Sequence, residues 1–193
     1  MQNAELKIIF IVFILHSAFI VLPSARADTV APSTTQSATT EFVSPEFRFR
    51  LRHPAQWTRP EHPVNDQVFS VRTPDVAPGD HRFGVVGLKI DNGPEGQSDA
   101  ATLLELSDSI AAYVFKGGAQ HVTVKPDKIG VANILARRVR FVTEQPSGKI
   151  ATMYVIAVRK RTEYVFNIAA PVELFDTMLP GVDELLKSFE LIE

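Results

Sequence analysis

Six of the histidine and aspartate side chains in the first half of the sequence are considered as possible zinc ligands. They are His53, His62, Asp66, Asp80, His81 and Asp91. A zinc site needs three or four such ligands at about 2.0–2.2 Å, and no His-x-x-x-His spacing enforces that arrangement here. We interpret the histidines as solvated loop residues, with a metal or ligand carrier as the alternative. His121, beside an expected strand, is interpreted as a pH-sensitive surface or sheet residue.

Nucleophilic catalysis needs a serine, threonine or cysteine that a neighbouring base activates. The chain contains no cysteine and no Gly-x-Ser-x-Gly elbow. The pair Gly93-x-x-Gly96 lacks the lysine and the strand-to-helix context of a phosphate-binding loop. These motifs predict neither an enzyme nor a cofactor site. A hydrolase or other enzyme with an unrecognised site stays the alternative.

The most suggestive polar feature is a run of arginines at every second position, Arg48, Arg50 and Arg52. In a strand these three side chains share one face of the sheet, where they could bind the carboxylates or phosphates of a partner. A charged ladder also protects an exposed strand from edge pairing. We favour protection or surface ion pairing, and partner binding is the alternative.

Other conspicuous side chains are expected to have structural roles. Trp57, in a Pro-x-x-Trp loop, is expected to pack a corner of the core, and a cap over a ligand pocket is the alternative. Two basic groups are interpreted as solvated charge: Arg137, Arg138 and Arg140, and Arg159, Lys160 and Arg161 at a turn.

The strands and helices that position these residues can be predicted from the spacing of apolar residues. Alternation from Phe47 predicts a half-buried strand with Phe47, Phe49 and Leu51 in the core. Further strands are expected at 68–73, 83–91, 120–125, 134–143, 150–159 and 163–170, and the last two are close enough to pair as a hairpin. The strand from Ile150 is apolar on both faces, which is typical of a strand inside a doubly covered sheet.

Helical patterns occupy the remaining segments. An amphipathic helix is expected from a cap at Ser98 or Asp99 to a stop at Gly117-Gly118. Pro171 is expected to start a short helix, and Pro180-Gly181 to restart the chain as a final helix. Strands, one helix, strands and then helices indicate an α+β fold with a mostly antiparallel sheet between helical layers.

The first 27 residues have the layout of a cleavable signal peptide. An apolar stretch at 8–22 ends at Pro23, and the small residues Ala25 and Ala27 precede the cut that we expect before Asp28. An uncleaved anchor is the alternative, but a membrane span usually needs about 20 apolar residues. We therefore expect a periplasmic or extracellular protein with no membrane span after cleavage.

Composition divides the rest of the chain into a leader and one domain. Residues 28–41 are nearly all Thr, Ser, Ala, Pro and Gln, which predicts a flexible leader, with a docking peptide as the alternative. Residues 42–193 have the length of a single domain. Because there is no cysteine, this domain relies on its hydrophobic core and not on disulfides. The net charge of −2 and the dispersed lysines and arginines predict no nucleic-acid partner.

Several short motifs in residues 42–193 resemble the PsbP-like family, which includes photosystem II PsbP and bacterial exported proteins such as DcrB and LpqN. They are Phe47-x-Phe49-x-Leu51, Pro54-x-x-Trp57, the strand at 83–90, the helix at 98–116, Tyr164-Val165-Phe166 and Leu186-Lys187-Ser188-Phe189. Asn133 stands where the family pattern has a glycine before the middle strand. The resemblance implies a three-layer α/β/α sandwich and a non-catalytic protein that binds or supports other components. We therefore expect an exported binding or accessory protein of the cell envelope, whose partner is an envelope protein or a small ligand.

Overall fold

A computed structural model describes residues 38–60, 66–76 and 82–192. The expected signal peptide lies outside these residues. The strands and helices are β1 (Thr39–Ser44), β2 (Phe49–Pro54), β3 (Phe69–Arg72), β4 (Val85–Asn92), α2 (Asp99–Lys116), β5 (Gln120–Ile129), β6 (Ile134–Gln145), β7 (Gly148–Arg159), β8 (Thr162–Pro171), α3 (Val172–Ser188) and β9 (Glu190–Leu191). Within these ranges, no helix is long and apolar enough to span a membrane.

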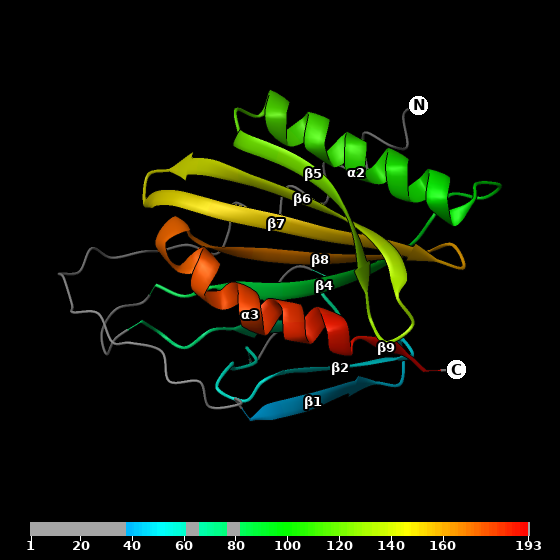
Figure 1. Ribbon diagram of the computed structural model, residues 1–193, viewed down its shortest axis with the longest axis horizontal. Coiled ribbons are helices and arrows are strands. Elements are labelled where there is room, and N and C mark those ends of the chain that lie inside the picture. Colours follow the sequence, from blue (N-terminus) through cyan, green and yellow to red (C-terminus); the bar gives the residue numbers. More distant parts are fainter. Residues whose placement is uncertain (1–37, 61–65, 77–81, 193) are drawn as a thin grey trace.

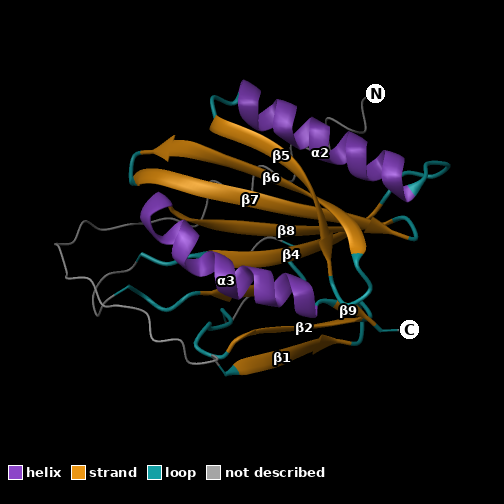
Figure 2. Ribbon diagram, in the orientation of Figure 1, coloured by secondary structure: helices purple, strands orange, loops and turns teal. Residues whose placement is uncertain are grey.

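The strands form two antiparallel sheets. Six strands make the larger sheet in the order β3-β4-β8-β7-β6-β5, and β1-β2-β9 make the smaller one. Helix α2 packs on one face of the larger sheet, against β5, β6 and β7, while α3 packs between the other face and β2 (Figure 1). Coloured by secondary structure, the same view shows the long strands lying between the two helices (Figure 2). This arrangement confirms the predicted α+β fold, a three-layer α/β/α sandwich.

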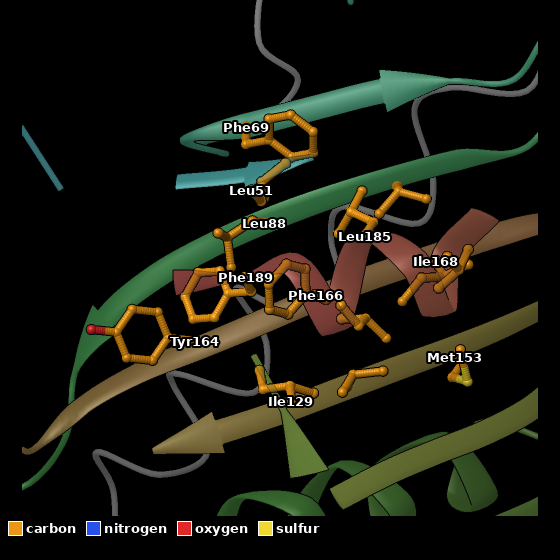
Figure 3. Packing of buried hydrophobic residues seen from close by; sticks show 14 of the residues in the cluster. Leu51, Phe69, Leu88, Ile129, Met153, Tyr164, Phe166, Ile168, Leu185 and Phe189 are labelled. Atoms are coloured by element: carbon orange, nitrogen blue, oxygen red, sulfur yellow. The ribbon is translucent and has the colours of Figure 1, made fainter. Parts of the chain in front are cut away.

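Each face of the larger sheet has its own hydrophobic cluster. The larger cluster joins the sheet to α3 and β2, and in Figure 3 the rings of Phe166 and Phe189 lie edge to face within it, with their centroids 5.4 Å apart. The smaller cluster lies beneath α2 and includes Ile110 and Tyr154. Strand β7 contributes buried side chains to both clusters, since it lies between β6 and β8 and is covered on both faces. The prediction that this strand is internal is therefore confirmed, as is its hairpin with β8.

The first strand pair corrects two boundaries of the sequence analysis. Strand β1 begins at Thr39, so the last three residues assigned to the leader form a strand instead. Phe47 is 38% exposed, because it lies in the turn between β1 and β2 and not in a strand. That turn ends at Arg48, whose φ of 55° is left-handed, and the chain enters β2 only at Phe49, which is fully buried. The expected burial of Phe47 was wrong because the alternation of polar and apolar residues continues through a turn.

The C-terminal helix is also longer than predicted. Proline removes one backbone hydrogen bond from a helix interior and disfavours the preceding turn. Nevertheless Pro180 lies inside a continuous α3 from Val172 to Ser188. Buried side chains occur on both sides of the proline, including Phe175 and Leu185, so packing of the whole helical face holds the two halves together. The predicted break at Pro180-Gly181 was wrong for that reason.

Helix α2 begins as predicted at Ser98, whose hydroxyl accepts a hydrogen bond from the amide of Ala101 at 3.3 Å. The neighbouring carboxylate of Asp99 accepts hydrogen bonds from the amides of Lys160 and Arg161 at 2.8 and 2.9 Å. Both of these turn residues have positive φ, of 50° and 66°. Asp99 therefore fastens the helix to the tight turn of the β7–β8 hairpin.

Candidate functional site

A groove of about 620 Å³ lies beside α3, where the end of β2 and the segment after β3 approach that helix. Its lining is mostly apolar and comprises Pro54, Gln56, Trp57, Thr73, Pro74, Val76, Gly84, Leu174, Thr177, Met178, Pro180, Gly181 and Glu184. This volume is in the range of about 300–1,000 Å³ that is typical of ligand sites. The groove is the candidate functional site.

Trp57 forms one wall of the groove and is held by backbone pairing on either side. Its amide donates to the carbonyl of Pro54 at 2.9 Å, and the next residue, Thr58, exchanges two backbone hydrogen bonds with Arg72. The indole is only 6% exposed and belongs to the larger core cluster. The expectation that Trp57 packs a corner of the core is confirmed, and the same side chain also lines the groove.

Gly181 allows α3 to lie directly against this wall. A Cβ atom at Gly181 would lie 2.8 Å from Cζ2 of Trp57 and 2.9 Å from Cγ of Pro54, closer than such atoms approach. The Pro180-Gly181 pair that was expected to interrupt the helix therefore has a different role. It brings the helix backbone close to the tryptophan.

The described residues of the groove contribute few polar groups. The hydroxyl of Thr177 donates to the carbonyl of Leu174 at 2.7 Å, and that of Thr73 accepts from the amide of Gly84 at 2.9 Å. Among the described lining residues, Glu184 carries the one formal charge. With a mostly apolar lining and hydroxyls already paired to the backbone, the described part of the groove is suited to binding an apolar group.

Of the residues considered for metal binding, the structure describes His53, Asp66 and Asp91. His53 lies on β2 and is 3% exposed, with its Nδ1 3.0 Å from the carbonyl of Pro54 and its ring 6.0 Å from that of Phe69. The interpretation of His53 as a solvated loop residue was therefore wrong, because the core alternation of β2 extends to it. Asp91 pairs with Lys89 at 3.1 Å.

His62, Asp80 and His81 lie outside the described residues. Within the described ranges, no three His, Cys, Asp or Glu side chains gather as metal ligands would. His121 is exposed in β5, at an irregularity where its φ is 55°, which confirms its interpretation as a surface residue of the sheet.

Strand β7 carries a buried phenol, Tyr154, that sequence analysis did not single out. Tyr154 is 1% exposed, and burial raises the pKa of its hydroxyl. Its oxygen has no hydrogen-bond partner within the described part of the chain, and the same is true of the hydroxyl of Thr152 on the same face of β7. A raised pKa keeps the phenol neutral near pH 7, so Tyr154 has no activated oxygen.

The three arginines expected to form a ladder do not share one strand. Arg48 lies in the preceding turn, while Arg50 and Arg52 are exposed on β2. Arg50 forms an ion pair with Glu190 of β9 at 2.8 Å, which confirms surface pairing for that residue. The prediction that the arginines protect an edge strand was wrong, because β2 lies between β1 and β9 in the smaller sheet.

The arginines of β6 are paired with acidic residues on other elements. The pairs are Arg137–Asp108, Arg138–Asp127, Arg138–Asp183 and Arg140–Asp176. Burial alone would lower the pKa of Arg138, but its hydrogen bonds to Asp127 and Asp183 outweigh burial and raise it. The interpretation as solvated charge was wrong for Arg138, which is only 28% exposed and links the sheet to α3. These ion pairs could not be predicted from the sequence, because the oppositely charged residues lie apart along the chain.

Comparisons with known proteins bear on the fold. No protein-family model matches the sequence, and no curated protein matches it either. Among solved structures, the chain is similar to cyanobacterial PsbP (CyanoP) from Synechocystis sp. PCC 6803, with a TM-score of 0.52 and 11% identity over 84% of this chain and 98% of that one. It is also similar to LpqN of Mycobacterium tuberculosis, with a TM-score of 0.51 and 11% identity over 83% and 87% of the two chains.

A protein from Bacteroides thetaiotaomicron VPI-5482 gives a TM-score of 0.51 and 15% identity, over 79% of this chain and 48% of that one. At such identities the likeness concerns the fold alone. Asn133, at the position where the family pattern has glycine, has a left-handed φ of 51°, a conformation that asparagine adopts more readily than most residues. The chain has the PsbP-like fold.

Proposed function

We propose that the protein is exported and acts as a non-catalytic binding or accessory protein of the cell envelope. The observation that supports this proposal most directly is the mostly apolar groove between Trp57 and α3, which is suited to binding an apolar group. Within the described ranges, neither His53 nor His121 is hydrogen-bonded to a serine or threonine hydroxyl. The partner is an envelope protein or a small ligand with an apolar group.

The compartment is inferred from the N-terminal sequence. The apolar stretch at 8–22 followed by Ala25 and Ala27 predicts cleavage before Asp28. LpqN, which has a similar fold, is described as involved in cell envelope biogenesis, and this analogy agrees with the proposal. N-terminal sequencing of the protein from an envelope or culture fraction should return Asp28. Recovery of a chain that starts at Met1 would refute export by cleavage.

The groove is tested by capture of partners from a solubilised envelope fraction, with two matched valine variants. Val76 lines the groove and is 50% exposed, whereas Val172 is 40% exposed, also apolar, and outside the groove. Val76→Asp places a charge where an apolar group would bind, so we expect at least about a tenfold loss of captured partner, equivalent to about 1.4 kcal/mol. Val172→Asp should leave capture unchanged. Equal capture by both variants would refute binding at the groove.

The exposed arginines Arg48 and Arg52 are proposed as an additional contact for carboxylates or phosphates of the partner. Arg50 is less suited to this contact because Glu190 already pairs with it. Arg52→Ala should weaken capture more strongly at low salt than at high salt, since exposed charges are screened. If salt concentration has no effect on capture by either this variant or the unmodified protein, the arginines are not part of the interface.

A further inference from the structure

The N-terminal leader joins the folded domain at the rim of the groove. The carbonyl of Ala38 accepts a hydrogen bond from the amide of Ala55 at 2.8 Å, and Thr39 pairs with Pro54 across β1 and β2. Ala55 lies between Pro54 and Gln56, and both of these residues line the groove. The chain that precedes Ala38 therefore starts next to the candidate site.

The leader is long enough to reach any part of the groove. Ten residues, 28–37, precede Ala38 after the proposed cleavage, and an extended chain spans about 3.3 Å per residue, or roughly 33 Å in all. Within this segment the apolar residues are consecutive: Val30, Ala31 and Pro32. They lie about 20 Å or more of extended chain from Ala38, which is enough to cross a groove of this size.

The chemistry of this short segment matches that of the groove. Proline fixes its own φ, so Val30-Ala31-Pro32 loses less conformational freedom on binding than an unrestricted segment. Proline-containing extended segments are commonly bound in grooves lined by aromatic rings. Trp57 and Pro54 provide such a wall, and Met178 adds an adaptable apolar surface.

We propose that residues 30–32 of the leader occupy the Trp57 groove as an intramolecular ligand, which a partner must displace. The occupancy rests on the proposed cleavage before Asp28, and the displacement rests in addition on the proposed binding of a partner. A short flexible linker provides an effective concentration on the order of 1 mM. If so short an apolar segment binds with a dissociation constant of about 1 mM, the groove is occupied about half of the time, and the leader weakens partner binding about twofold.

Trp57 provides a direct measurement because it is the only tryptophan of the chain. The chain from Asp28 onward is compared with a variant that carries Val30→Ser and Pro32→Ser, and acrylamide quenching of Trp57 fluorescence is measured in both. Loss of the apolar residues should raise the quenching constant about twofold, because the groove is then open all of the time instead of half. A control with Thr34→Ser and Thr35→Ser retains the apolar residues and should quench like the unmodified chain.

A second measurement adds a synthetic peptide of residues 28–37 to the variant with Val30→Ser and Pro32→Ser. At concentrations of several mM the peptide should lower the quenching constant again, and the same peptide with both serine replacements should not. Identical quenching in all chains, together with no effect of the peptide, would overturn the proposal. That result leaves capture of partners by the groove intact. Conversely, a failure to capture any partner would not change the expected quenching of Trp57 fluorescence. The two proposals can therefore be refuted separately.

Discussion

Replacing Gly130 with alanine tests how the β5–β6 turn is attached to the end of α3. Gly130 has a φ of +73°, and a Cβ atom there would come within 2.4 Å of the carbonyl oxygen of Phe189. That oxygen already accepts a hydrogen bond from the amide of Val131 at 3.0 Å, and the amide of Gly130 donates to Leu186 at 2.8 Å. Gly96 is a matched control, because its φ is +80° and nothing lies within 4 Å of its Cβ position.

The size of the effect follows from these contacts. Both alanines must adopt a left-handed conformation, which costs about 1–2 kcal/mol for a residue with a side chain. Alanine also restricts the unfolded chain, but this contribution is similar at the two sites and cancels in the difference. At Gly130 the contact is with backbone, so the turn and the helix end must separate. Weakening two hydrogen bonds of about 0.5–1.5 kcal/mol each adds roughly 1–3 kcal/mol.

Equilibrium unfolding in urea, followed by Trp57 fluorescence and by far-ultraviolet circular dichroism, measures this difference. Gly130→Ala should lose about 2–5 kcal/mol of unfolding free energy and Gly96→Ala about 1–2 kcal/mol, with similar m-values. Equal losses in the two variants would show that the contact with Phe189 has no energetic weight. The reasoning about the turn would then be refuted.

Three further predictions use the same unfolding measurement. Phe49→Ala should cost about 3–5 kcal/mol because its ring is fully buried, whereas Phe47→Ala should change stability by less than about 0.5 kcal/mol, and equal costs would contradict the assigned start of β2. Arg138→Ala should cost about 1–3 kcal/mol because two partly buried carboxylates lose a partner, and more than Arg140→Ala, whose pair is exposed and contributes under about 1 kcal/mol. Ser98→Ala should cost about 1 kcal/mol through loss of the helix cap, and an unchanged midpoint would argue against the cap.

The parts of the fold that sequence analysis predicted correctly are those that local patterns determine. Period-two alternation and apolar runs located the strands of the larger sheet, and the run from Ile150 identified β7 as internal. Ser98 and Gly117 marked the ends of α2, because capping depends on neighbours in sequence. The resemblance to the PsbP-like family, based on short motifs in residues 42–193, agrees with the observed fold.

The candidate site was only partly predictable. Trp57 was singled out by its loop motif, but the sequence gives no indication that Met178 and Gly181, more than a hundred residues later, complete the groove. The continuous path of α3 through Pro180 was missed because a local rule about proline ignores the burial of the helical face on both sides. The same limit applies to Phe47, whose alternating pattern extends into a turn.

Sequence by itself determined which segments are strands and helices, where α2 begins and which strand lies inside the sheet. These properties depend on side-chain periodicity and on hydrogen bonds between close neighbours in the chain. Only the tertiary structure decided that Arg138 joins Asp127 to Asp183, that Asp99 holds the β7–β8 turn, and that Trp57 meets α3 at Gly181. Such contacts join residues far apart in sequence, and their partners are selected by the packing of whole elements, because only packing brings two distant side chains within bonding distance.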